Sequence, residues 1–249
     1  MALDEQSEHL PEYGVTAEFY DLLQAERDLR RVTRLYRDLV KEAKAAVLDV
    51  GAGTGVVTAI LLRRTGVLVH AVEPALPMRT ALLSRLSAMG ADQRARVTVH
   101  ACDLQSSGLR EAADAAVCHN LVAGLEPAGR RALWPALHRA LRPGALLAVE
   151  TPPCVVPAAA RTSSLPRVRL GQDVYGARVV TTPDRGRISA RFEYHVHRDG
   201  REIRRHAETF TLWPLTAGEL GREIEAAGFA TESVHEEVLL ARRVERTGD

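Results

Sequence analysis

The spacing of hydrophobic positions divides the first part of the chain into alternating helices and strands. From about Thr16 to Lys44, apolar residues recur at mainly helical spacing among many charges, which predicts one amphipathic helix or two consecutive ones. Strand and helix patterns then follow in the order β-α-β-α-β, over residues 45–50, 58–65, 67–73, 77–90 and 96–103. This order is typical of a parallel sheet covered by helices.

A second half continues the same alternation. Residues 114–122 and 145–150 have strand patterns, and residues 128–141 between them have a helical one. An Arg-Pro-Gly sequence follows that helix and is expected to end it, because proline and glycine both stop helices. Residues 151–166 contain several prolines and show no periodicity, which predicts a connector or a mobile flap and marks a boundary.

The following segment predicts a long antiparallel hairpin. Residues 187–213 alternate with period two on both sides of Asp199-Gly200, a dipeptide typical of tight hairpin turns. On the first arm, one face is apolar and carries Ile188, Ala190, Phe192, Tyr194 and Val196. The other face is polar and carries Arg191, Glu193, His195 and His197. We expect one face to meet apolar surface and the other to meet water or a substrate.

The chain ends with a helix and strand material. Thr216 begins the helix with Glu219 as its capping-box partner, and Gly228 ends it. Four segments are therefore predicted: an N-terminal helical cap, an α/β core, a flap with the hairpin, and a C-terminal helix and strand that complete the core. They span residues 1–44, 45–151, 152–214 and 215–249.

The balance of charges does not favour a highly charged partner. The 33 basic and 32 acidic residues nearly balance, so no excess of one sign predicts a nucleic-acid or membrane partner. Signal-peptide and membrane-span patterns are absent from the sequence, which predicts a cytoplasmic protein. The three cysteines have no CxxC spacing, and His195 and His197 have no third ligand at supporting spacing, so we predict neither disulfides nor a metal site.

Residues 47–58, VLDVGAGTGVVT, form a glycine loop between a strand and a helix. Backbone N–H groups at such a helix start bind phosphate or another anionic group. A dinucleotide site would have the spacing G-x-G-x-x-G, whereas here Gly51, Gly53 and Gly55 are followed by Val56. Asp49 ahead of the loop would repel a pyrophosphate and attract an ammonium. A zwitterionic amino-acid group therefore fits better, and a nicotinamide dehydrogenase is disfavoured.

Two further acids follow the next two strands. Glu73 lies 22 residues after Gly51, where a carboxylate can accept both hydroxyls of a ribose. Asp103 follows the third strand, where it can accept a hydrogen bond from the exocyclic amine of an adenine. Three acids at successive strand ends indicate a nucleoside-containing cofactor.

With these acids in place, the core resembles the class I S-adenosylmethionine-dependent methyltransferases. The resemblance covers residues 45–151 and is carried, in the expected order, by LDVGAGTG, AVEPALPM, ACDL and LRPGALLAVE. It implies a Rossmann-like, doubly wound α/β sheet of the seven-stranded methyltransferase type, with N-terminal helices and an inserted antiparallel hairpin as a platform. S-adenosylmethionine is the cofactor that it implies.

The resemblance also implies a set of cofactor contacts. The methionine part would be held by Asp49 and by Gly51, Ala52, Gly53, Thr54 and Gly55. The ribose would be held by Glu73, and the adenine by Pro74, Met78, Asp103 and Leu104. The sulfonium would lie beside His119 and Asn120.

The outer segments are similar to small-molecule methyltransferases, notably natural-product and amino-sugar N-methyltransferases. EYGVTAEFYDLL, FEYHVHRDG and LTAGELGREIEAAGF carry this looser similarity. In that branch an N-terminal tyrosine closes over the cofactor, which here is Tyr13 or Tyr20, and the hairpin covers the active site. His119, Tyr20 and His195 are the candidate catalytic residues.

We expect methyl transfer to a small-molecule or peptide-borne acceptor in specialised metabolism. Glu193, His195 and Glu208 are expected to form one polar face that receives a cationic acceptor, which favours N-methylation of an amine. O-methylation of a small metabolite is the close alternative. A protein that binds S-adenosylmethionine without transferring a methyl group is the alternative of another class. The sequence leaves a homodimer open.

Overall fold

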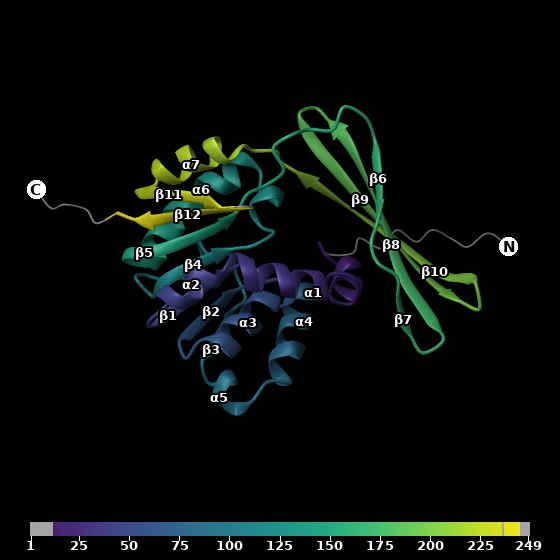
Figure 1. Cartoon of the computed structure of the whole chain (residues 1–249), viewed down its shortest axis with the longest axis horizontal. Coiled ribbons are helices and arrows are strands. Elements are labelled where there is room, and N and C mark those ends of the chain that lie inside the picture. The colour runs from purple at the N-terminus through teal and green to yellow at the C-terminus, as the bar shows by residue number, and fades with distance from the viewer. Residues whose placement is uncertain (1–11, 236, 245–249) are drawn as a thin grey trace, which may run out of the picture.

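The computed structural model describes residues 12–235 and 237–244, and it contains two β-sheets joined by a long helix (Figure 1). The larger sheet has seven strands in the order β11-β12-β5-β4-β1-β2-β3. In chain order these strands are β1 Ala46–Val50, β2 Leu68–Val72, β3 Val97–His100, β4 Ala113–Cys118, β5 Leu141–Glu150, β11 Phe229–His235 and β12 Val238–Arg243. All neighbours pair in parallel except the two pairs that β12 makes, which are antiparallel.

Helices cover both faces of this sheet, as the resemblance implied. One face packs against α6 Pro127–Ala140 and α7 Ala217–Glu225, where Trp134 and Ile224 are buried with Leu48 of β1. The opposite face packs against α1 Thr16–Leu35, α2 Arg37–Glu42, α3 Val56–Arg64 and α4 Leu76–Ser87. Short helical turns at α5 Ala91–Arg94 and η1 Val122–Gly124 complete the set of described helices. The predicted Rossmann-like α/β fold is confirmed.

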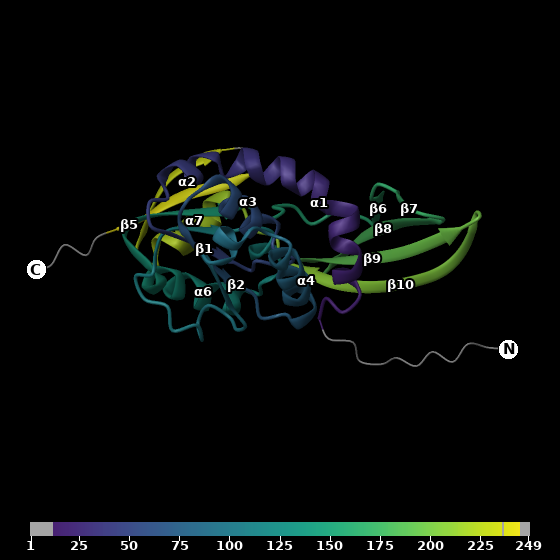
Figure 2. The same cartoon turned by 90° about the horizontal axis from the view of Figure 1, so that it is seen from below.

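The smaller sheet is antiparallel and has the order β10-β9-β8-β6, with β7 also paired to β8. Its strands are β6 Arg161–Ser164, β7 Val168–Leu170, β8 Asp173–Asp184, β9 Arg187–Arg198 and β10 Arg201–Leu212. One end of α1 packs on this sheet, where Phe19 stacks on Tyr194 with ring centroids 4.6 Å apart. The other end of α1 lies on the large sheet, so the helix spans both (Figure 2).

The predicted hairpin is confirmed as β9 and β10. Asp199 and Gly200 have φ values of 49° and 76°, the left-handed conformation that a two-residue hairpin turn of this kind requires. The predicted apolar face is also confirmed, since Tyr194 and Val196 are almost fully buried. The capping box at the start of α7 is present as well, with the Thr216 hydroxyl accepting from the Glu219 backbone N–H.

The segment predicted as a connector or a mobile flap, residues 151–166, contains part of the small sheet. Residues of β6 lie within it, and β8 adds a twelve-residue strand that the hydrophobic pattern did not reveal. All four β6 residues are exposed, so this strand has no apolar signal and is held by its pairing with β8. In β8 a glycine, two threonines and a proline interrupt the apolar alternation on which strand prediction depends.

Asp49 is an acid buried between the large sheet and the helices that cover it. It lies in β1 on the side that faces α3, it is 1% exposed, and its Oδ2 accepts a 2.5 Å hydrogen bond from the Thr58 hydroxyl. Burial raises the pKa of Asp49 from 3.8 to about 6, although the Thr58 hydrogen bond and the nearby His119 oppose the rise.

None of the described helices is long and apolar enough to cross a membrane.

We predict that Gly55→Ala destabilises the fold. Gly55 has a φ of +84°, and a Cβ there would lie 2.4 Å from Cδ1 of Leu82 in α4. Left-handed strain of roughly 1–2 kcal/mol and overpacking of about 1–3 kcal/mol add up in this variant. Urea unfolding measures the loss, with Gly66→Ala as the control because a Cβ at Gly66 meets nothing within 4 Å. Equal stability of the two variants would show that α3 and α4 do not pack as described.

We also predict that Asp49→Asn stabilises the ligand-free protein at neutral pH. Because the pKa of Asp49 is raised to about 6 in the folded state, the native protein keeps a proton between about pH 4 and 6 that the unfolded chain has lost. Stability from this group therefore falls as the pH rises through that window. The free energy of unfolding of the variant relative to wild type should rise by up to about 3 kcal/mol from pH 4 to 6 and then stay constant. A difference that does not change with pH contradicts this burial.

Candidate active site

A cavity of about 500 Å³ opens at the carboxyl ends of β1, β2 and β4. β1 lies between β2 and β4. The strands β2 and β3 extend the sheet on one side of β1, and the later strands, beginning with β4, extend it on the other side. In open α/β sheets, ligands bind at the point where the strand order reverses. The cavity occupies that point, and the beginning of α1 contributes to its wall.

The loop after β1 forms the floor of the cavity. Gly51, Gly53 and Gly55 have φ values of 70°, 56° and 84°, a conformation that other residues adopt only with strain. The N–H groups of Gly51 and Ala52 donate to the carbonyl oxygen of Val72 in β2, at 2.9 and 3.0 Å. A Cβ at Gly53 would meet no heavy atom closer than 3.9 Å, so this side of the loop is open. The loop can therefore lie directly against a ligand.

Glu73 ties the ends of β1 and β2 together. Its Oε2 accepts the Gly53 N–H and its Oε1 accepts the Ala75 N–H, both at 2.8 Å. The side chain lines the cavity, and the residue is only 5% exposed. Burial raises the pKa of Glu73, and the two N–H groups and Arg79 oppose that rise. Each carboxylate oxygen has a second acceptor position, so Glu73 can accept two further hydrogen bonds.

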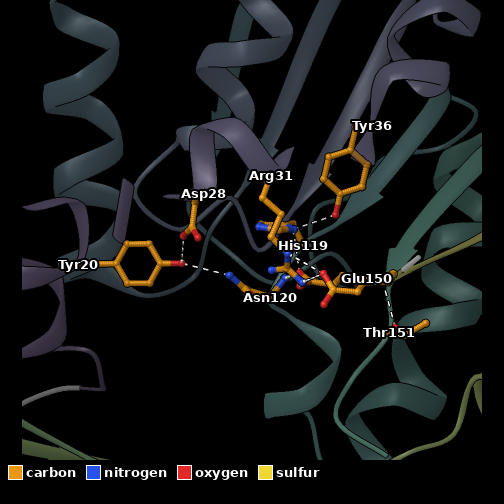
Figure 3. A network of polar contacts seen from close by, with 9 residues as sticks. Tyr20, Asp28, Arg31, Tyr36, His119, Asn120, Glu150 and Thr151 are labelled. Carbon is orange, nitrogen blue, oxygen red and sulfur yellow. Dashed lines mark hydrogen bonds and ion pairs between the residues drawn. The ribbon is translucent and has the colours of Figure 1, made fainter. Parts of the chain in front are cut away.

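Two tyrosines from the N-terminal part of the structure line the cavity. Tyr13 has a φ of 63° and stacks on Phe210 of β10, with ring centroids 5.1 Å apart. Burial, with added repulsion from nearby acids, raises the pKa of the Tyr13 hydroxyl to about 12, so it stays protonated. The Tyr20 hydroxyl donates to Asp28 and accepts from the Asn120 side-chain amide, both at 3.2 Å (Figure 3).

His119 follows β4 and contacts a second carboxylate at the cavity wall. Its Nδ1 lies 2.8 Å from Oε2 of Glu150, the last residue of β5, and 2.9 Å from the Tyr36 hydroxyl (Figure 3). Glu150 also accepts the Asn120 N–H at 2.7 Å and pairs with Arg31. The Nε2 of His119 is buried and has no hydrogen-bond partner among the described residues. His119 is nevertheless one of the residues that line the cavity.

Most residues predicted from the sequence meet in this cavity. Those that line it are Tyr13, Tyr20, Gly51, Ala52, Gly53, Thr54, Glu73, Pro74, Met78, His119 and Asn120. Asp49 and Gly55 lie behind the loop and are not among the lining residues. Asp103 is exposed and accepts the Ser106 N–H, and Leu104 is buried in the core. The structure therefore does not bring Asp103 and Leu104 into the described cavity.

His195 lies elsewhere, on the far face of the small sheet. It lines a separate cavity of about 380 Å³ together with Arg178 and Glu193. Glu208 pairs with Phe192 in the strand register, so it lies on the opposite face from Glu193 and His195, and it accepts the Thr16 N–H at 2.7 Å. The expectation that these three residues form one acceptor-binding face is wrong, because neighbouring strands place directly paired residues on the same side.

Several polar residues of the cavity wall and its surroundings were not predicted. Glu12 and Asp28 line the cavity, and Tyr36 and Glu150 contact His119 behind it. Glu150 could have been predicted as a site residue, because it is an acid at the last position of a strand. Glu73, which was predicted, directly follows a strand. Asp28 had no such signal, since a charge on an amphipathic helix most often faces solvent.

The lining of the cavity is acidic. Glu12, Asp28 and Glu73 contribute carboxylates, and no lysine or arginine occurs among the described lining residues. Carboxylates in a cavity attract cations, and they bind them more strongly where water is excluded. The described lining therefore suits a positively charged ligand.

Comparison with known proteins agrees with this geometry. Residues 47–144 match the family described as methyltransferase domain. DesVI from Streptomyces venezuelae is 19% identical with a TM-score of 0.72, and the match covers 92% of this chain and 98% of that one. The chain is also similar to CalS10, an amino pentose methyltransferase from Micromonospora echinaspora solved with bound S-adenosylmethionine, at 22% identity, a TM-score of 0.64, and coverage of 98% and 99%.

A third solved structure is similar over its whole length, the sugar N-methyltransferase KedS8 from Streptoalloteichus. It is 20% identical with a TM-score of 0.70, and the match covers 98% of this chain and 99% of that one. No protein with curated annotation matches the chain significantly. Residues 47–144 thus match a methyltransferase domain, and the chain shares its overall fold with solved methyltransferases such as CalS10 and KedS8.

Proposed function

We propose that the protein transfers the methyl group of S-adenosylmethionine to an amine of a small molecule or a modified peptide, in specialised metabolism. The observation that carries the proposal is the acidic cavity with an unpaired imidazole nitrogen in its wall. Both the sulfonium donor and a protonated amine are cations, so carboxylates in the lining favour both.

The lining fits S-adenosylmethionine on three counts. Glu73 keeps two acceptor positions for ribose hydroxyls after accepting the Gly53 and Ala75 N–H groups. The open side of the loop at Gly53 leaves room for the methionine part. Residues 74–78 line the cavity and can form a wall against the adenine. When bound, the cofactor supplies a methyl group that is already activated by its positive sulfur.

The protein's own contribution is alignment, exclusion of water and removal of a proton. Transfer from a sulfonium is an in-line displacement, so correct placement of the nucleophile lowers the barrier substantially. α1 runs from the large sheet to the small sheet (Figure 2), and Tyr13 and Tyr20 from this part of the chain line the cavity, where they can limit the access of water. The hydroxyl of Tyr20 and the carboxylate of Asp28 can orient an ammonium group beside Asn120. His119 Nε2 can then accept its proton.

Similar proteins support an amine over a hydroxyl as the acceptor. KedS8 is described as a sugar N-methyltransferase and CalS10 as an amino pentose methyltransferase. O-methylation remains the second candidate, because the unpaired Nε2 of His119 also suits the base that a hydroxyl acceptor requires. Binding of the cofactor without transfer is the candidate of a different class, and release of S-adenosylhomocysteine separates it from both.

A screen of matched acceptors tests the proposal. Purified protein is incubated with S-adenosylmethionine and pairs of small sugars that differ only in carrying an amine or a hydroxyl at one position. We expect S-adenosylhomocysteine release and methylated product with amines and little with the hydroxyl partners. Preference for the hydroxyl partners would replace N-methylation by O-methylation. Cofactor binding with no turnover on either set would support the non-methylating candidate.

Glu73→Gln should weaken cofactor binding without unfolding the protein. The amide keeps one acceptor oxygen but loses the charge and one acceptor position for the ribose. Hydrogen bonds to charged groups contribute about 1.5–3 kcal/mol, so we expect S-adenosylhomocysteine to bind roughly 10-fold to 150-fold more weakly by calorimetry. Glu126→Gln, at an exposed position outside the cavity, is the control. Equal affinity of the two variants would remove Glu73 from the ribose site.

A further inference from the structure

The contact between His119 and Glu150 determines which nitrogen of the imidazole carries the proton. Nδ1 of His119 lies 2.8 Å from Oε2 of Glu150, a distance at which one of the two atoms must donate to the other. A carboxylate has no proton to give and accepts only. If Glu150 is ionised, the proton of the neutral imidazole lies on Nδ1, and Nε2 has a free lone pair.

The surroundings keep Glu150 ionised. Oε2 accepts the Asn120 backbone N–H at 2.7 Å, and Oε1 pairs with the Arg31 guanidinium, which also bonds Glu237 at 2.8 Å. Burial raises the pKa of Glu150, but the His119 contact, the Asn120 N–H and Arg31 together outweigh burial and hold the pKa below its ordinary value. Asn120 adopts a φ of 51°, a left-handed conformation that asparagine tolerates, and this turn directs its N–H to the carboxylate.

Tyr36 is the competing partner of the same nitrogen. Its hydroxyl lies 2.9 Å from Nδ1 and could donate to it, which would place the imidazole proton on Nε2 instead. That arrangement would leave an unprotonated Nδ1 facing the Glu150 carboxylate, so two lone pairs would oppose each other at 2.8 Å. Burial raises the pKa of Tyr36 well above its ordinary value, so the hydroxyl stays neutral and can accept from Nδ1. Asp49, from β1, also interacts electrostatically with His119, and Asp28, from α1, lines the same cavity.

We propose that Glu150 is a positioning residue that holds the His119 proton on Nδ1 and so keeps the lone pair of Nε2 free to accept a proton. The proposal rests on the methyl-transfer function above and adds the residue that makes His119 a base. Nε2 is buried and lacks any partner among the described residues, as a base awaiting its substrate would. Arg31 and Glu237 fix Glu150 in turn, through contacts that extend to the turn between β11 and β12.

The proton and electron movements balance. The acceptor ammonium first gives one proton to Nε2 of His119, which leaves a neutral nitrogen with a lone pair. This lone pair forms the bond to the methyl carbon, and the sulfur keeps the electron pair of the bond that breaks. The imidazolium then carries protons on both nitrogens, with the Nδ1 proton still bound to Glu150. Release to solvent returns His119 to its starting state.

The tautomer can be measured without any substrate. In protein labelled with ¹⁵N in the histidine rings, two-dimensional NMR distinguishes a proton on Nδ1 from one on Nε2, and a His119→Asn variant identifies the signals of His119. In the wild type at a pH where the ring is neutral, we expect the proton on Nδ1. A proton on Nε2 overturns the proposal, whatever the activity of the protein.

Two variants separate the partners of Nδ1. Glu150→Ala removes the carboxylate and leaves Tyr36, so we expect the proton to move to Nε2. Tyr36→Phe removes the hydroxyl and leaves the carboxylate, so we expect the proton to stay on Nδ1. The reverse pattern would assign the control of His119 to Tyr36 and overturn the proposal. If Glu150→Ala does not fold, the wild type and Tyr36→Phe still decide it.

Kinetics with an accepted amine give the second readout. Because general base catalysis contributes about 10²–10⁴-fold, Glu150→Ala should lower kcat by roughly 10-fold or more while the affinity for S-adenosylhomocysteine changes little. Glu126→Gln, at an exposed position outside the cavity, should keep kcat near that of the wild type. An unchanged kcat in Glu150→Ala contradicts the proposal. Failure of the wild type to bind S-adenosylhomocysteine would instead contradict the proposed function, and the tautomer result would stand.

Discussion

The turn after β1 is the constraint on which the rest of the structure depends. Three glycines in left-handed conformation fold the chain back on itself within five residues. The turn then bonds β2 through Val72 and packs against α4 at Leu82. It also reaches α1, because the Thr54 hydroxyl donates to Asp21, which pairs with Arg85 of α4. This short loop thereby connects β1 and α3 with β2, with α4 and with α1, the helix that packs on the small sheet.

In the proposed function, carboxylates divide the site into a part that binds the cofactor and a part that removes a proton. Glu73 lies at the loop, where backbone N–H groups satisfy one acceptor position of each oxygen and leave the others to a ligand. On the other side, Asp28 and Glu150 flank His119 and Asn120 behind the ends of β4 and β5 (Figure 3). Carboxylates would thus serve two purposes at this site: Glu73 would accept hydrogen bonds from the cofactor, and Glu150 would hold the proton of His119 on Nδ1.

The sequence predicted the core well because a buried parallel sheet leaves a strong periodic signal. The glycine loop, Glu73 and His119 follow directly from motifs at strand ends, and the cavity brings them together. Contacts made between distant segments had no such signal. Strand β8 shows no alternation, and the face of Glu208 depends on a cross-strand register that only the fold fixes. Glu150 is an acid at the end of a strand, a position typical of binding sites. Its contact with His119, 31 residues earlier in the chain, depends on the fold and could not be predicted from the spacing of the two residues.

The central claim is that the cavity at the carboxyl ends of β1, β2 and β4 binds S-adenosylmethionine. Calorimetric titration of the purified protein with S-adenosylhomocysteine, and separately with NADH, tests it most directly. We predict micromolar binding of S-adenosylhomocysteine with one site per chain and no detectable binding of NADH. Binding of NADH without S-adenosylhomocysteine, or binding of neither, would contradict the account.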